Sequence, residues 1–213
     1  MLMNDSHETT SSAFTWATHL LATHPDIQTR LREELRAALP SPSSQIHEVP
    51  PDLQQSLEDL PLLNAVCNET LRLYPTVPVT VRIASKDTTV MDNFIPQNTL
   101  FLLSPWATNR NSKLWGPDAM QFVPERWIDK ETGKANNTGG VSSNYCQLTF
   151  LHGPRSCIGE KFARAELKAL IAVFVGAFSM ETVKETGSPI PAGAITSKPH
   201  AGMHLKLKVV DGW

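Results

Sequence analysis

One cysteine stands in a sequence context that suits metal chemistry. Cys157 follows a loop that contains Gly153, Pro154 and Arg155, and an amphipathic segment comes directly after it. The spacing predicts that the loop delivers Cys157 to the first turn of a long helix, where backbone N–H groups and the helix dipole favour negative charge. A thiolate is a soft and strongly donating metal ligand. The alternative is a structural cysteine that caps a core helix, because free cysteines are commonly just buried.

The residues around Cys157 suit a large, flat partner that carries negative charge. Gly153 and Gly159 have no side chain, so the backbone can approach such a group closely. Arg155 can pair with an anionic part of it. The loop therefore has the residue types for a bulky metal-containing group as well as for the metal itself.

The ten residues that end at Gly159 resemble the haem-binding signature of the cytochrome P450 family. That signature is Phe-x-x-Gly-x-Arg-x-Cys-x-Gly, and its fixed positions are matched at Phe150, Gly153, Arg155, Cys157 and Gly159. The resemblance implies that Cys157 is the axial thiolate ligand of a haem b iron, and that Arg155 holds a haem propionate. In such enzymes the thiolate pushes electron density onto the iron and favours cleavage of the O–O bond.

A second pattern pairs a carboxylate with arginines. Glu69 and Arg72 are three residues apart, so they share a helix face. Alone, such a pair is usually solvated and contributes little. Residues 122–127, which include Arg126, resemble the cytochrome P450 motif whose arginine joins this pair. The resemblance implies that Glu69, Arg72 and Arg126 are structural residues that lock helix and loop together near the proximal side of the haem, since a buried carboxylate must be paired.

A third pattern is the acid–alcohol pair Glu8-Thr9. It resembles the segment of the family's long central helix that crosses the distal face of the haem, and the two groups together can relay protons in general acid–base catalysis. Glu8 and Thr9 are therefore the candidate catalytic residues. The alternative is an ordinary helix start, although Ser6 followed three residues later by Thr9 is a poor capping box. The family normally has a small residue and a glycine where this chain has Asp5 and Ser6.

The resemblance also implies further site residues and a reaction. Arg82 stands where relatives often place a haem-propionate ligand, and a surface arginine is the alternative. Residues 76–80 and 192–196 match regions that line the substrate pocket. The implied reaction inserts one atom of dioxygen into a small hydrophobic organic substrate, often a lipid or a secondary metabolite. Electrons would come from NADPH through an NADPH–cytochrome P450 reductase.

Hydrophobic periodicity predicts a chain that is mainly α with small β-sheets. Helices are predicted over residues 8–23, from residue 25, over 61–74 and over 158–174. The last of these is expected to turn one set of side chains inward, namely Phe162, Leu167, Leu170, Ile171 and Phe174. Short strands are predicted over residues 79–83, 99–103 and 204–210, with turn residues between the first two. A Pro/Ser linker is predicted at 40–51 and a long, function-bearing loop at 105–147.

Composition narrows the class of protein. The chain has 213 residues, of which 41% are hydrophobic and 19% charged, as in an ordinary globular domain. A net charge of -2 without a basic cluster argues against a nucleic-acid partner. The three cysteines, Cys67, Cys146 and Cys157, are sparse and odd in number, which fits a reducing compartment better than a disulfide scaffold. Their spacing excludes a Cys-x-x-Cys zinc site. No targeting or transmembrane segment is predicted in this chain.

The resemblance covers essentially the whole chain. It implies that residues 1–213 are the C-terminal part of a cytochrome P450 domain of the eukaryotic microsomal type, with the N-terminal half and the membrane anchor absent. The full-length parent would then lie at the cytosolic face of the endoplasmic reticulum membrane. Without the missing helices, Phe14 and Trp16 are expected to lack packing partners.

Two alternatives to a monooxygenase remain open from the sequence. One is a truncated, catalytically inactive fragment of a cytochrome P450, which at most binds a partner. The other is a related lyase or isomerase that rearranges peroxides without a reductase. Such relatives tend to lose the acid–alcohol pair, so the intact Glu8-Thr9 argues against the second alternative.

Overall fold

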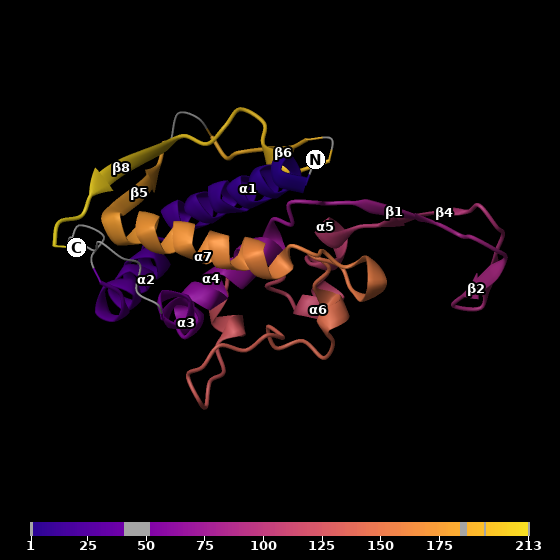
Figure 1. Cartoon of the computed structure of the whole chain (residues 1–213), viewed down its shortest axis with the longest axis horizontal. Helices are drawn as coiled ribbons and strands as arrows, with labels where there is room; N and C mark the ends of the chain where they lie inside the picture. Colours follow the sequence, from indigo (N-terminus) through magenta and orange to yellow (C-terminus); the bar gives the residue numbers. More distant parts are fainter. Residues whose placement is uncertain (1, 41–51, 184–186, 194, 213) are drawn as a thin grey trace.

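The computed structural model describes residues 2–40, 52–183, 187–193 and 195–212, with side chains from residue 7 onward. Almost all of the predicted 40–51 linker, and the side chains of Asp5 and Ser6, lie outside the described residues. Figure 1 shows a helical body with a long, thin β arm projecting from one end. None of the helices in the described ranges is long and apolar enough to cross a bilayer.

The helices and strands follow the chain in this order. The helices are α1 (Leu2–Thr23), α2 (Pro25–Ala38), α3 (Leu53–Glu58), α4 (Pro61–Leu73), α5 (Pro105–Thr108), α6 (Ser112–Trp115) and α7 (Glu160–Ala177). Three 3-10 turns are η1 (Pro124–Trp127), η2 (Asn144–Cys146) and η3 (Gly153–Arg155). The strands are β1 (Thr80–Ile83), β2 (Thr88–Val90), β3 (Asn93–Ile95), β4 (Leu100–Leu103), β5 (Phe178–Thr182), β6 (Pro191–Ala192), β7 (Lys198–Pro199) and β8 (Leu205–Val209). The mixed, mainly helical fold predicted from the sequence is confirmed.

The core lies where α1, α2, α4 and α7 meet. Helix α7 packs along α1, and both contact α4, as Figure 1 shows. Leu31 and Leu35 of α2 recur every four residues and are fully buried, as their spacing predicts. Leu63 of α4 and Ile171 of α7 meet them in one apolar cluster. This packing fixes α1 and α7, the two helices that lie next to the cysteine loop.

The bounds and inner face of two helices differ from the prediction. Helix α1 begins at Leu2 rather than at residue 8, and α7 begins at Glu160 rather than at residue 158. Leu167 and Ile171 are buried, but Phe162 is 64% and Leu170 39% exposed, so their predicted inward orientation is wrong. Both lie to the side of the Leu167–Ile171 stripe, which faces the other helices.

Trp16 does not lack packing partners. It is fully buried, and its ring stacks on that of Tyr74 with 4.1 Å between ring centroids. Its indole N–H donates to the Ser197 carbonyl at 3.1 Å. Phe14 meets the Phe174 ring edge-on at 5.4 Å. The expectation that Phe14 and Trp16 would lack partners is therefore wrong, because Phe174 packs against Phe14, and Tyr74 and Ser197 contact Trp16.

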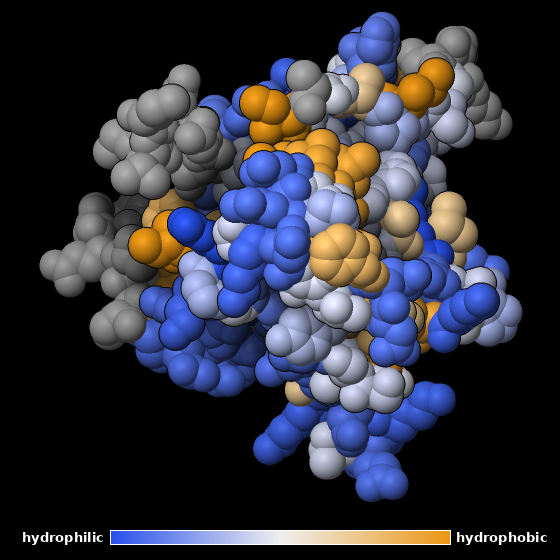
Figure 2. Space-filling model, turned by 90° about the vertical axis from the view of Figure 1, so that its right-hand side faces the viewer, coloured by the Kyte–Doolittle hydropathy of each residue, from blue (hydrophilic) through white to orange (hydrophobic). Residues whose placement is uncertain are grey.

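All four sheets are two-stranded and antiparallel within the described residues. Strands β1 and β4 form the arm, and β2 pairs with β3 at its tip, where only a turn was predicted. Strand β8 pairs with β5, and the short β6–β7 pair lies over the start of α1 (Figure 1). Figure 2 shows the molecule from the side on which the arm projects, and this surface carries hydrophobic residues interspersed among hydrophilic ones.

Candidate functional site: the cysteine loop and its cavity

Backbone hydrogen bonds hold Cys157 at the end of a tight loop. The Phe150 carbonyl accepts the Cys157 N–H at 2.9 Å, and η3 is closed by the Ser156 N–H donating to the Gly153 carbonyl at 3.0 Å. Gly153 has φ +75°, a conformation that only glycine adopts readily. The sequence predicted that Cys157 would lie in the first turn of the helix, but it lies just before α7. Cys157 is exposed.

Asn109, which the sequence analysis missed, anchors the segment that enters this loop. Its side chain is fully buried, and its amide nitrogen donates to the Thr149 hydroxyl at 2.9 Å. Its amide oxygen accepts the Leu148 N–H at 2.7 Å, while the Thr149 hydroxyl donates to the Leu71 carbonyl of α4 at 2.8 Å. These partners are some 40 residues away in sequence, so no local pattern marks Asn109.

The exposed thiol opens onto a cavity of about 340 Å³. The lining is mainly apolar and comes from five parts of the chain: Thr9, Thr76, Val77, Thr80, Pro105, Thr149, Phe150, Leu151, Arg155, Cys157, Ile158, Gly159 and Ala163. The structure thus brings Thr9 of α1 together with Cys157, Phe150, Arg155 and Gly159. Arg155 is exposed and makes no ion pair or hydrogen bond within the described residues, so its guanidinium can accept an anionic partner.

Three of the predicted catalytic and cofactor-binding residues, namely Gly153, Arg82 and Glu8, are not part of this lining. The Arg82 guanidinium folds onto its own strand, donating to the Val81 carbonyl at 2.8 Å and to the Thr80 hydroxyl at 3.3 Å. Glu8 turns toward the C-terminal segment, where its carboxylate accepts hydrogen bonds from Thr196 at 2.9 Å and Lys198 at 3.2 Å. The Thr196 hydrogen bond and, after it, Lys198 lower the pKa of Glu8.

A buried cluster behind the loop gathers the second predicted set. In this Glu69 cluster (Glu69, Arg72, Arg126 and Trp127), the Glu69 carboxylate accepts five hydrogen bonds. Two come from Arg72 and one each from Arg126, the Trp127 indole and the Val123 N–H. Glu69 and Arg72 are both fully buried. A carboxylate is stable there because every lone pair faces a donor.

Arg72 extends the Glu69 cluster to the loop that carries Asn109. Its five N–H groups are all used: two donate to Glu69, and the others to the carbonyls of Asn109 at 2.8 Å, Ala119 at 2.6 Å and Gln121 at 3.0 Å. Because Asn109 also holds Leu148 and Thr149, one connected set of contacts runs from Glu69 to the segment that enters the cysteine loop. These contacts therefore hold the backbone of the segment that leads into the cysteine loop.

The other two cysteines are unsuited to bind a ligand. Cys67 and Cys146 are buried and free, and burial raises the pKa of the Cys67 thiol to about 12. No group of three or more His, Cys, Asp or Glu side chains in the described residues is placed to hold a metal ion. Cys157 is therefore the accessible soft ligand of this part of the chain.

Comparison with known proteins gives one family. The cytochrome P450 family model matches residues 1–205. The cytochrome P450 monooxygenase sphH of Aspergillus fumigatus is 50% identical over 211 residues, which cover 97% of this chain and 37% of that protein. The cytochrome P450 monooxygenase ptmK of Penicillium ochrochloron is 48% identical over 202 residues, covering 95% of this chain and 39% of that protein.

The chain spans about two fifths of the length of these curated relatives. A third relative, the cytochrome P450 monooxygenase buaD of Petromyces alliaceus, is 38% identical over 217 residues and covers the whole of this chain. The family model alone covers far more than half of the sequence. The chain belongs to the cytochrome P450 family.

Proposed function

We propose that the protein to which this region belongs is a haem-thiolate monooxygenase and that Cys157 is the axial ligand of its haem iron. One observation carries the proposal: the chain's one exposed thiol opens onto a mainly apolar cavity that also includes Thr9. The relatives named above are monooxygenases of the same family. Residues 1–213 would then be the C-terminal part of one cytochrome P450 domain.

The residues around the cavity fit a haem. Its ring is apolar, as is most of the lining, and its iron takes a thiolate. Its propionates need cations, and Arg155 is exposed and unpaired among the described residues. Arg82 is the second proposed propionate partner, because it contacts Thr80, which lines the cavity. When bound, haem would supply the activation of dioxygen.

The chain's own residues would then divide the remaining work. Cys157 donates electron density as thiolate, and the contacts from Glu69 through Asn109 hold the backbone that presents it. The Thr9 hydroxyl holds or passes a proton at its Oγ1 atom, and Glu8, next to it in sequence, exchanges protons with solvent. Phe150 and the two glycines, Gly153 and Gly159, shape the loop against the ring.

The reaction follows from this division and from the family. It would insert one oxygen atom into a small hydrophobic organic substrate, with electrons from NADPH through a cytochrome P450 reductase. We place the full-length protein at the cytosolic face of the endoplasmic reticulum membrane and its substrate in secondary metabolism. These assignments rest on the family's general character, whereas the thiolate assignment rests on the loop itself.

The test is a spectrum of the full-length protein. Reduced and exposed to CO, it should show the thiolate-type band from which the family takes its name. Cys157→Ser should abolish that band, because serine gives no thiolate, while Cys67→Ser and Cys146→Ser should retain it. A Cys157→Ser protein that kept the band would overturn the assignment.

A separate measurement tests Thr9. Thr9→Ala should retain the CO band but divert electrons from NADPH to peroxide, because proton delivery is impaired while iron ligation is not. Thr9→Ser keeps the hydroxyl and is the matched control. If NADPH consumption stayed tightly coupled to product in Thr9→Ala, Thr9 would have no part in proton transfer.

A further inference from the structure

We propose that Thr196 and Lys198, on the C-terminal β6–β7 hairpin, are positioning residues that set the orientation and protonation of Glu8. The inference rests on the proposed function, since it assumes that Glu8 supplies protons to the Thr9 side of the cavity. It adds a control that comes from the other end of the chain. Neither residue touches the cavity that contains Cys157.

The hairpin is seated firmly on α1. The Ser197 carbonyl accepts hydrogen bonds from the Trp16 indole at 3.1 Å and from the Ser12 hydroxyl. The Ser197 N–H donates to the Thr76 carbonyl at 2.7 Å, and Ser197 itself is buried. Thr76 lines the cysteine cavity. The residues on either side of Ser197 are therefore held over the start of α1 by a buried anchor.

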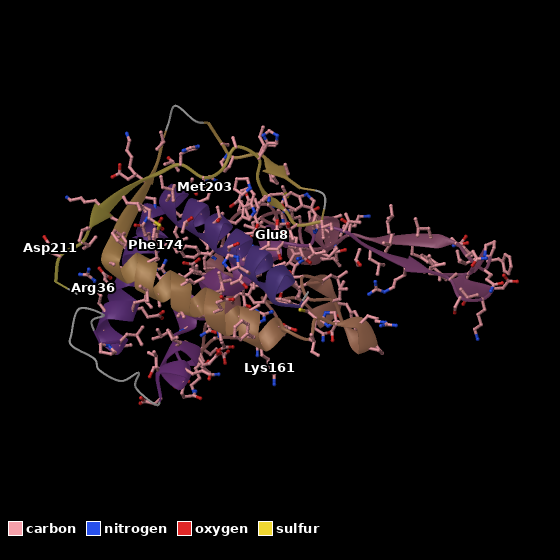
Figure 3. The ribbon with its side chains drawn as sticks, turned by 45° about the horizontal axis from the view of Figure 1, so that its top comes forward. Glu8, Arg36, Lys161, Phe174, Met203 and Asp211 are labelled. Atoms are coloured by element: carbon pink, nitrogen blue, oxygen red, sulfur yellow. The ribbon has the colours of Figure 1, made fainter. Side chains whose placement is uncertain are left out.

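Two side chains of the hairpin converge on one oxygen of Glu8. Thr196 donates its hydroxyl at 2.9 Å and Lys198 its ammonium group at 3.2 Å, both to Oε1. Figure 3 shows Glu8 on α1 beside the C-terminal segment. Thr9 lines the cavity but Glu8 does not, so the two members of the acid–alcohol pair face different surroundings. The hairpin thus holds the carboxylate away from the hydroxyl that it would serve.

Stability alone does not explain this contact. Both partners of the ion pair are about half exposed, with side-chain exposures of 59% for Lys198 and 51% for Glu8. Exposed pairs of this kind contribute little to folding and are screened by salt. Removing Lys198 should therefore leave the fold intact while changing the charge around Glu8. The anchor at Ser197 keeps the hairpin in place when either donor is removed.

The physical consequence is control of proton supply. Both donors favour the ionised form of Glu8, so its pKa lies below the ordinary value. A carboxylate held by an ammonium and a hydroxyl picks up a proton less readily and turns inward less often. Loss of either donor should raise the fraction of protonated Glu8 at acid pH and free its side chain. The Thr196 hydrogen bond is the largest single cause of the lowered pKa, and Lys198 acts through both a hydrogen bond and its charge, so the loss of either residue should be measurable.

The first experiment measures Glu8 directly in the full-length protein. Carboxyl ¹³C resonances of labelled glutamate are followed against pH, and the Glu8 signal is assigned by its loss in Glu8→Gln. Thr196→Val and Lys198→Met should each raise the pKa of Glu8, and Lys198→Arg should restore the lowered pKa that Lys198→Met loses. Lys208→Met removes the same charge from β8, which pairs with β5, and should change nothing.

Salt provides a second readout in the same titration. High ionic strength should raise the pKa of Glu8 in the unsubstituted protein, because it screens the ammonium group, and should have a weaker effect in Lys198→Met. An unchanged Glu8 pKa in both Thr196→Val and Lys198→Met would overturn the proposal. This titration needs neither haem nor turnover, so its outcome is separate from that of the CO spectrum.

The second experiment links the contact to catalysis in the holoenzyme. The share of NADPH electrons that ends in peroxide is measured against pH. In Thr196→Val and Lys198→Met the acid limb of this profile should move to higher pH, as the pKa of Glu8 does, and Lys198→Arg should bring it back. A raised Glu8 pKa with an unmoved profile would show that the hairpin titrates Glu8 without controlling proton supply, which also overturns the proposal.

Discussion

Cysteine chemistry in this chain is decided by exposure. The Cys157 thiol is exposed at the cavity, whereas Cys67 and Cys146 are buried in the two core clusters. We expect one thiol per folded chain to react rapidly with a colorimetric thiol reagent and two more to react after denaturation. Mass spectrometry should locate the rapid label at Cys157. Rapid labelling of Cys67 in the folded chain would contradict the packing around α4.

The buried thiol also gives a pH dependence. Burial raises the pKa of Cys67 to about 12, above its value in the unfolded chain, so its contribution to stability is fully present below the unfolded pKa. That contribution is lost as the pH rises through the alkaline range, because only the unfolded chain ionises readily. Cys67→Ala should show a smaller fall in stability in that range, as measured by urea unfolding at several pH values.

Removal of Glu69 should leave a cation stranded in the core. Arg72 is fully buried and donates two of its hydrogen bonds to that carboxylate. Breaking a buried pair from one side typically costs about 3–5 kcal/mol. Glu69→Ala should therefore lose that much unfolding free energy in urea. Trp127→Phe removes a single donor from the Glu69 cluster and should cost less; equal losses would show that packing, rather than the charge, dominates.

Between elements, α2 caps α4. Both oxygens of Glu34 accept N–H groups at the start of α4, from Leu62 and Leu63, each at 2.9 Å. These N–H groups have no partner within the helix, so the carboxylate does the work of a cap. Glu34→Ala should destabilise the chain by about 0.5–2 kcal/mol in urea, the range for a lost cap. Glu34→Gln, which still offers an acceptor, is the matched control and should lose less.

The same cap should depend on pH. Burial, only partly offset by the two N–H groups, raises the pKa of Glu34 above its ordinary value. A raised pKa means that the contribution of Glu34 is fully present below the unfolded pKa and declines as pH rises through the folded one. The stability difference between the unsubstituted chain and Glu34→Gln should therefore shrink from acid to neutral pH. A difference that grew over that range would contradict a raised pKa.

Helices that bury a regular stripe were predictable, and contacts between distant segments were not. Helices α2 and α4 begin where Pro25 and Pro61 stand and repeat apolar residues every three or four positions, so sequence alone marks them. Strands β2 and β3 have three residues each, nearly all exposed, and show no alternation that would distinguish them from a turn. Their pairing depends on the arm as a whole.

The candidate site divides in the same way. The spacing around Cys157 predicted a loop before a helix, and that loop is present, displaced slightly from the start of α7. The turning of Glu8 toward Lys198 was not predictable, because the two residues are 190 positions apart. Asn109 was missed for the same reason. Sequence patterns report local geometry, whereas these contacts follow from how α1, α4 and the C-terminal hairpin pack.

At the scale of the whole molecule, the helical body and the arm differ in how their apolar side chains are satisfied. The body buries its leucines among four helices, whereas one face of the arm carries Val81, Ile83, Leu100 and Leu102 in paired register and leaves them exposed. A two-stranded hairpin is marginally stable by itself, and open strand edges favour association. In the 213-residue chain this face should therefore promote self-association.

Substitution on the arm tests that expectation. Leu102 is 68% and Leu100 58% exposed, and burying each such side chain between chains is favourable by about 1.5–3 kcal/mol. Leu100→Thr with Leu102→Thr keeps residues suited to a strand but removes that gain. The double variant of the 213-residue chain should scatter less light at a given concentration, with the thermal unfolding midpoint of the helical body unchanged. Met120→Thr alters an equally exposed apolar residue outside the arm and should leave association as it was. If Met120→Thr lowered the scattering and the double variant did not, the association surface would lie on the body, and the arm would be a passive extension of it.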